Sequence, residues 1–125
     1  MNYEKMTSIP SKMAQKIRLN GCHCFRGQAH TVIIYIKDDD DIKQLQNIIH
    51  QLPHGDQTNF FFFDDNCIIV PIHVMTTYNI PLPESPFDAD VKIVINGTWM
   101  INKTRHVHCW VDNINITNID YSSYL

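Results

Sequence analysis

The sequence predicts a β-rich α+β domain, built as a mostly antiparallel sheet or a small barrel, with one amphipathic helix at about residues 40–52. Residue usage is the first observation behind this prediction, because Ile and Asn together supply 29 of the 125 residues whereas Ala supplies three. Ile favours strands, and Asn is a weak helix former. The second observation is that apolar runs of strand length alternate with turn residues, while a single segment has helical periodicity.

The length of the chain supports one compact domain with a single core. Hydrophobic residues make up 44% of the sequence and charged residues 18%, a balance that excludes a charge-driven disordered chain. No linker or internal repeat divides residues 1–125, so we expect a single domain. Residues 1–12 are expected to form a flexible N-terminal arm, and residues 118–125 a frayed tail.

Helical periodicity is confined to one segment, in which Ile42, Leu45 and Ile49 recur at helical spacing. The run Asp38–Asp41 precedes it, where carboxylates cap a helix and complement the positive end of its dipole. The same run could hold a metal ion instead. No regular loop of oxygen ligands follows it, however, which favours the capping role.

The apolar runs on either side of this helix predict antiparallel strand pairs. Residues 13–37 form the first pair, and its second strand, Thr31–Ile36, is β-branched or aromatic throughout, which is typical of a central strand. A second hairpin joins residues 59–63 to residues 67–74. Pro71 indicates an edge position or a bulge on its second strand, because proline donates no ladder hydrogen bond.

An irregular, proline-rich connection is expected at residues 76–90, and a long closing hairpin follows, with strands at residues 91–101 and 105–116. Each strand and the helix has an apolar phase that should face the core. These phases predict five largely buried side chains: Ile34, Leu45, Ile49, Ile69 and Val107.

The net charge of −3 is unevenly distributed along the chain. Residues 1–37 carry a net charge of +5, residues 38–90 a net charge of −9, and residues 91–125 a net charge of +1. If the two ends of the chain meet in space, they can form a positive face despite the acidic total.

The cysteine and histidine positions raise the question of a zinc site. Cys22, Cys24, His30 and the run His106–Cys109 would converge if the first and last strands paired. Zinc needs four nitrogen or sulfur ligands in a tetrahedron, whereas strand alternation points the two histidines of that run away from its cysteine. We therefore expect reduced thiols, no metal site and no cofactor.

Motifs of catalysis and of export are missing from the sequence. It contains no nucleophile elbow, phosphate-binding loop or H-E-x-x-H motif, so we expect a non-enzymatic protein without catalytic residues. Apolar runs such as Val32–Ile36 are far shorter than the roughly 20 residues of a membrane-spanning helix. The first residues lack the apolar segment of a secretory signal, which favours an intracellular location, in the cytoplasm or the nucleus.

The last strand carries the most informative pattern. Its even-numbered side chains should face outward and include His106, His108 and Trp110, near the cations Lys92 and Arg105. Rings beside cations suit single-stranded nucleic acid, since bases stack on rings while Lys and Arg contact phosphates. The alternative is that the tryptophan packs under the proline-rich connection and the histidines are ordinary surface residues.

The closing hairpin also resembles that of an OB-fold domain. In such domains a V-x-V-x-G-x-W strand is followed by a strand ending in V-x-x-I. Here the stretch Val91–Trp99 matches the first pattern, with Ile93 and Ile95 in place of valines, and residues 111–114 within Arg105–Ile116 match the second. The resemblance covers about a fifth of the chain. The OB helix normally follows the third strand, whereas the helix expected here follows the second.

This resemblance implies a small OB-like barrel that binds single-stranded nucleic acid, as viral, phage and replication-protein-like OB domains do. Combined with the outward face of the last strand, it predicts six nucleic-acid contacts: Lys92, Trp99, Lys103, Arg105, His108 and Trp110.

A protein–protein interaction module is the alternative function, as a homodimer or as a subunit of a larger assembly, for example a viral one. The rings of Phe60–Phe63 are either all covered or partly exposed as a platform for a partner. Net acidity argues against nucleic-acid binding, since affinity depends largely on phosphate neutralisation. The uneven charge distribution partly answers that objection.

Overall fold

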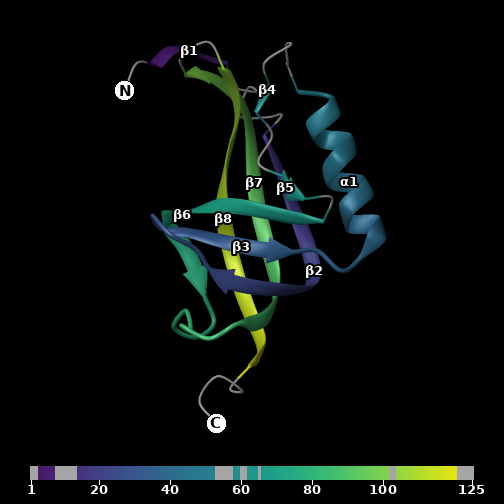
Figure 1. Ribbon diagram of the computed structural model, residues 1–125, viewed down its shortest axis with the longest axis vertical. Helices are drawn as coiled ribbons and strands as arrows, with labels where there is room; N and C mark the ends of the chain where they lie inside the picture. The colour runs from purple at the N-terminus through teal and green to yellow at the C-terminus, as the bar shows by residue number, and fades with distance from the viewer. Residues whose placement is uncertain are drawn as a thin grey trace.

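The computed structural model describes residues 3–7, 14–52, 58–59, 62–64, 66–101 and 104–120, and the side chains of residues 14–52, 66–98 and 106–120. The chain forms one helix and eight strands within these ranges (Figure 1). In order they are β1 (Tyr3–Thr7), β2 (Gln15–Arg26), β3 (Thr31–Tyr35), α1 (Asp39–His50), β4 (Thr58–Asn59), β5 (Phe62–Asp64), β6 (Cys67–Tyr78), β7 (Phe87–Ile101) and β8 (Thr104–Ile119).

Five of the strands close into a ring in the order β2-β3-β6-β8-β7, with β7 pairing back to β2. The pairing of β6 with β8 is parallel, and the other four pairings of the ring are antiparallel. Figure 1 shows β7 and β8 running along the length of the molecule, while β3 and β6 cross them steeply. The ring is therefore not a regular barrel, but the predicted β-rich α+β class is confirmed.

The bend of β2 allows the ring to close. The register of β2 against β7 shifts between Leu19 and Cys22, and Gly21 in this bulge has a φ of +62°, a left-handed conformation that glycine adopts without strain. Two carboxylates accept the backbone N–H groups of the bulge: Asp41 accepts from Asn20 and Asp90 accepts from Gly21, both at 2.8 Å. The first half of β2 consequently pairs with β7, and the second half turns to pair with β3 as well.

The helix begins where the aspartate run predicts. Asp38 is its N-cap, and the Oδ1 atom of Asp38 accepts hydrogen bonds from the backbone N–H groups of Asp40 at 2.9 Å and Asp41 at 3.4 Å. The capping role is thus confirmed. The helix ends at His50, two residues before the expected end, and Leu52 beyond it is still buried.

The core lies inside the ring and under α1. Ile34 and Leu45 are fully buried and Ile49 is 4% exposed, as predicted. The prediction for Ile69 is wrong, because Ile68 and Val70 point inward and Ile69 is half-buried on the opposite face. Val107 is likewise half-buried rather than largely buried, although it packs against the core.

The expected irregular connection at residues 76–90 is shorter in the structure. β6 continues to Tyr78, because a shift in register after Ile72 transfers it from pairing with β3 to pairing with β8. Pro71 lies just before that shift, opposite Thr31 at the end of the pairing with β3. In the strand order β6 lies between β3 and β8, which contradicts the edge interpretation of Pro71, and the irregularity of β6 follows Pro71 at residues 72–77.

The expected N-terminal arm and C-terminal tail each contain residues that belong to a strand. Within the expected arm, residues 3–7 form β1, which pairs with the far end of β7. Within the expected tail, β8 continues to Ile119, and residues 121–125 lie outside the described residues. The side chains of Phe60–Phe63 also lie outside them, as does the segment 53–57 after the helix.

Candidate functional site

The pairing of β2 with β7 brings the basic first third of the sequence against the closing hairpin. Ile17 and Leu19 of β2 point into the core, so Lys16 and Arg18, which alternate with them, point outward. On β7, Val91 and Ile93 are buried while Lys92 between them is exposed. Three cations thus share the outer surface of neighbouring strands, as the charge distribution of the sequence allowed.

Arg18 and Lys92 are direct cross-strand partners in the register of β2 and β7. Like charges at directly opposite positions destabilise a sheet. Asp90 offsets part of this repulsion, since its Oδ2 atom lies 3.4 Å from Nη2 of Arg18. Lys92 has no ion pair with any residue whose side chain is described. Two cations and one carboxylate leave the position with a net positive charge.

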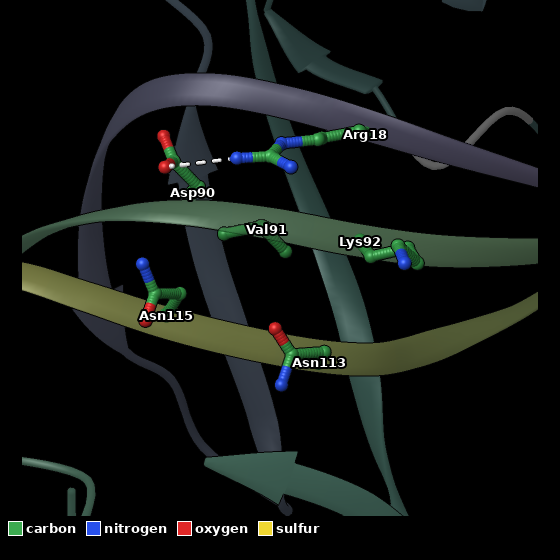
Figure 2. A pocket seen from close by; sticks show the side chains of 6 residues that line it. All are labelled: Arg18, Asp90, Val91, Lys92, Asn113 and Asn115. Carbon is green, nitrogen blue, oxygen red and sulfur yellow. Dashed lines mark hydrogen bonds and ion pairs between the residues drawn. The ribbon is translucent and has the colours of Figure 1, made fainter. Parts of the chain in front are cut away.

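A hollow of about 230 Å³ opens at this position on the outer surface. Figure 2 shows that its walls come from all three strands, with Arg18 on β2, Lys92 on β7, and two amide side chains on β8. The complete lining is Arg18, Asp90, Val91, Lys92, Asn113 and Asn115. The hollow therefore presents two cations, two amides and one carboxylate to solvent.

A cluster of three rings lies beside the hollow. The indole of Trp110 has its ring centroid 5.5 Å from that of His73 and 5.3 Å from that of His108. Trp110 is opposite Val94 in the β7–β8 register, and Val94 is opposite Lys16 in the β2–β7 register. Lys16 also forms an ion pair with Asp112 at 3.8 Å.

The bulge of β6 fixes the cluster. The buried hydroxyl of Thr76 donates to the carbonyl of Val111 at 2.5 Å and accepts from the backbone N–H of His73 at 2.9 Å. The Nδ1 atom of His73 accepts a hydrogen bond from the backbone N–H of Met75 at 3.0 Å, which orients this imidazole beside the indole. Burial lowers the pKa of His108, because the charged imidazolium is poorly solvated there. An uncharged ring next to Trp110 is therefore favoured.

We call this surface the basic–aromatic face and define it by six residues: Lys16, Arg18, His73, Lys92, His108 and Trp110. Its residues come from four strands, and it contains three of the six contacts that the sequence predicts, namely Lys92, His108 and Trp110.

Of the other three predicted contacts, Trp99 and Arg105 lie toward the far end of the hairpin. Trp99 of β7 pairs with His106, and Arg105 of β8 pairs with Met100. The side chains of Trp99 and Arg105 are outside the described residues, as is the whole of Lys103.

Sequence reasoning did not select Lys16, Arg18 or His73 as site residues. A local signal exists for the first two, since basic residues alternate with Ile17 and Leu19 along β2. Lys16 and Arg18 lie near Lys92 only because β2 pairs with β7, and no local pattern in the sequence indicates that pairing. His73 reaches Trp110 only through the bulge of β6.

A second group of rings lies on β2 and β3. The Phe25 ring packs edge-to-face against His23 at 4.9 Å and against Tyr35 at 5.7 Å. The Nδ1 atom of His23 lies 2.9 Å from Oδ1 of Asp88, and the Lys37 ammonium lies 3.7 Å from the same oxygen. The hydrogen bond from His23 is the main reason that the pKa of Asp88 is lowered. Since the Asp88 carboxylate pairs with Lys37, this group is less cationic than the basic–aromatic face.

The cysteines face away from the surface. Cys22 and Cys24 both point into the core from β2, as the C-x-C alternation predicts, and Cys109 is buried on β8. Burial raises the pKa of Cys22 and of Cys109 to about 12, and it raises that of Cys24 as well. His30 is instead exposed, in the turn between β2 and β3. Within the described part of the chain, no group of three or more His, Cys, Asp or Glu side chains is arranged to hold a metal ion.

An exposed apolar segment adjoins the ring cluster. Val74 is 91% exposed and Met75 is 74% exposed, at the bulge of β6. Tyr78 and Ile80, at the end of the same strand and just after it, are each 39% exposed. Exposed apolar side chains in sequence are typical of surfaces that contact a partner.

Comparisons with known proteins add no assignment: no family model, curated protein or solved structure matches this chain. Nowhere in the described residues is there a helix with the length and apolar character needed to cross a membrane.

Proposed function

We propose that this protein is a non-enzymatic binding protein for single-stranded nucleic acid, and that the strand lies across the basic–aromatic face. The observation that carries the proposal is the direct opposition of Arg18 and Lys92 beside the Trp110 ring cluster. A backbone phosphate bound between these two cations would neutralise a repulsion that the unbound sheet has to tolerate.

The arrangement of rings and cations supports the same assignment. Trp110 and Lys16 belong to strands separated by β7, so their backbones are about 10 Å apart at the usual spacing of strands. An extended nucleic-acid strand can therefore stack a base on the indole while its phosphates contact Lys16, Arg18 or Lys92. Because every base has a π-face, this mode of binding tolerates different sequences.

The predicted contacts Trp99, Lys103 and Arg105 extend the proposed path. β7 and β8 continue beyond Trp110, and Trp99 and Arg105 belong to that continuation, whereas Lys103 lies outside the described residues. A strand that follows the hairpin would meet further cations there. The contacts of these three residues remain part of the proposal.

The topology supports the proposal that the ring is related to the OB fold. OB domains are five-stranded, partly open Greek-key barrels that bind oligonucleotides, and the ring β2-β3-β6-β8-β7 also has five strands. The position of the helix departs from the OB pattern, because α1 precedes β6, the third strand of the ring, rather than following it. We further propose an intracellular location, in the cytoplasm or the nucleus, where the four free cysteines would stay reduced.

The test is titration of a fluorescent thymidine oligomer with protein at about 50 mM and about 200 mM salt. We expect binding that weakens with salt, and we expect Arg18→Gln and Lys92→Gln each to flatten the salt dependence by about 0.7 in the logarithmic slope. Lys43→Gln is the matched control, since it removes one exposed cation from α1, outside the face. Absence of binding by a folded protein at the lower salt concentration would refute the proposal.

The exposed segment around Val74 and Met75 favours a second candidate, a protein–protein interaction module that forms a homodimer or joins a larger assembly. Here the apolar side chains at the bulge of β6 would be covered by the partner. Light scattering separates the two functions: a homodimer would show a mass that rises with concentration and falls after Met75→Asp. A concentration-independent monomeric mass would count against the homodimer.

A further inference from the structure

Asn113 in the hollow has a fixed amide orientation. Its Nδ2 atom lies 2.8 Å from Oγ1 of Thr77 and 3.4 Å from the backbone carbonyl oxygen of Thr77. A carbonyl oxygen only accepts hydrogen bonds, so the group that faces it has to be the NH₂ of the amide. The Oδ1 atom of Asn113 is consequently on the other side, and Figure 2 shows this oxygen directed toward β7 and the hollow.

The hollow therefore combines strong donors with an oriented amide acceptor, beside the Asp90 carboxylate, whose two oxygens already accept from Arg18 and Gly21. Arg18 and Lys92 supply cationic N–H groups, and Asn113 is the direct cross-strand partner of Lys92. Two nitrogens of Arg18 are held in place, since Nε donates to Asn20 at 3.0 Å and Nη2 donates to Asp90 at 3.4 Å. Nη1 has no partner among the described residues and remains available to a ligand.

The chemistry of this set discriminates between sugars. The oxygens of a phosphodiester accept hydrogen bonds and donate none, so a phosphate uses Arg18 and Lys92 but gives nothing to the Asn113 oxygen. The ribose 2′-hydroxyl is a donor, and its carbon is bonded to the one that carries the 3′-phosphate. Deoxyribose has no such donor, and the 2′-hydroxyl is the group by which a protein tells RNA from DNA.

We infer that the hollow binds one sugar–phosphate unit of RNA, with the phosphate between Arg18 and Lys92 and the ribose 2′-hydroxyl donating to Oδ1 of Asn113. The hollow has a volume of about 230 Å³ and opens onto the outer surface, where an extended strand can reach it. This inference rests on the proposed binding of single strands and deepens it, because it makes RNA the preferred strand.

The experiment compares three oligomers that share the same base: oligouridine, oligodeoxyuridine and 2′-O-methyl oligouridine. We expect the protein to bind oligouridine about threefold to tenfold more tightly than oligodeoxyuridine, the value of one exposed hydrogen bond. The 2′-O-methyl oligomer keeps the sugar oxygen but lacks its proton, so it should bind no better than the deoxy oligomer. This arm uses the unaltered protein and does not depend on the folding of any variant.

The residue assignment is tested with Asn113→Ala, which should reduce the affinity ratio of oligouridine to oligodeoxyuridine to about one while still permitting binding through the cations. Asn47→Ala is the matched control, because it removes an exposed amide from α1 and should leave the ratio unchanged. Equal binding of the two oligomers by the unaltered protein would overturn the inference while leaving the proposed function intact. So would a preference that survives in Asn113→Ala or extends to the 2′-O-methyl oligomer. Failure to bind any of the three would refute both.

Discussion

Asp41 of α1 and Asn20 of β2 are joined by a hydrogen bond of 2.8 Å, in which the buried carboxylate accepts from a backbone N–H at the bulge. The contact ties the helix to the point where β2 bends. It therefore joins the helix that covers the core to the strand that carries Lys16 and Arg18 on the outer surface.

Removing this acceptor should destabilise the fold. Asp41→Ala leaves the Asn20 N–H without its partner, and the free energy of unfolding should fall by about 1–3 kcal/mol in urea denaturation. Asp39→Ala is the control, because Asp39 is exposed in the first turn of the helix and contributes mainly through the helix dipole, about 0.3–1 kcal/mol. Equal decreases in the free energy of unfolding for the two variants would show that the Asp41–Asn20 hydrogen bond does not stabilise the fold beyond the helix-dipole effect.

Truncating a fully buried apolar side chain should lower the free energy of unfolding more than truncating a half-buried one. Leu45→Ala removes a fully buried side chain and should lower the free energy of unfolding by about 2–5 kcal/mol. Ile69→Ala removes a half-buried one and should cost clearly less, below about 2 kcal/mol. Denaturant titrations of both variants measure this. A loss below about 1 kcal/mol for Leu45→Ala, well under the usual range, would remove the helix from the core.

Asp88 should give the protein an acid-sensitive contact. Its pKa is lowered in the folded state, chiefly by the hydrogen bond from His23 and also by Lys37. A lowered pKa means that the contribution is fully present above the unfolded-state value of 3.8 and is lost as pH falls through the folded-state value. Unfolding of Asp88→Asn and the unaltered protein, followed from about pH 6 to about pH 2, should show a stability difference that shrinks toward acid. A difference constant over that range would contradict the assignment.

The cysteines should be unreactive in the native protein. Because burial raises the pKa values of the Cys22, Cys24 and Cys109 thiols, little thiolate is present near neutral pH. We expect alkylation by iodoacetamide to be slow in buffer and fast in urea, as followed by mass spectrometry. We also predict that no zinc co-purifies, which elemental analysis tests. One zinc per chain, lost in the Cys22→Ser, Cys24→Ser double variant, would overturn that prediction.

Trp110 should carry most of the stacking energy if the proposed function is right. Trp110→Ala is expected to weaken binding of a thymidine oligomer by about 1–3 kcal/mol, with little dependence on base sequence. Tyr35→Ala is the matched control, since this ring is 37% exposed but belongs to the second group of rings on β3. Fluorescence anisotropy gives both affinities. A larger effect from the tyrosine would move the binding surface to β2 and β3.

Local patterns in the sequence predicted what local forces determine. The helix, its aspartate cap and the closing hairpin were all identified, because periodicity and capping act over a few residues. The prediction that Ile69 is buried is wrong, because residues 67–70 are apolar throughout and their register with β3 decides which of them face inward.

The candidate site could be predicted only in part, for a similar reason. Lys92, His108 and Trp110 share one hairpin, so strand alternation sufficed to place them on one face. Arg18 joins them because β2 pairs with β7, and its ion-pair partner on β7, Asp90, is 72 residues away in the sequence. His73 joins them through the bulge of β6. Neither the long-range pairing nor the bulge leaves a periodic signal in the sequence.

The closure of the ring also determines when the basic–aromatic face can form during synthesis of the chain. β2 is synthesised early, yet its partner β7 emerges from the ribosome only after the helix and four more strands, and β8, the partner of β6, emerges last of all. Contacts this distant in the chain form slowly, because the loop-closure entropy is lost before the contacts compensate for it. During that interval the edge of β2 is unpaired and open to intermolecular pairing. A nascent chain would therefore carry the cations of β2 well before it could hold them opposite Lys92.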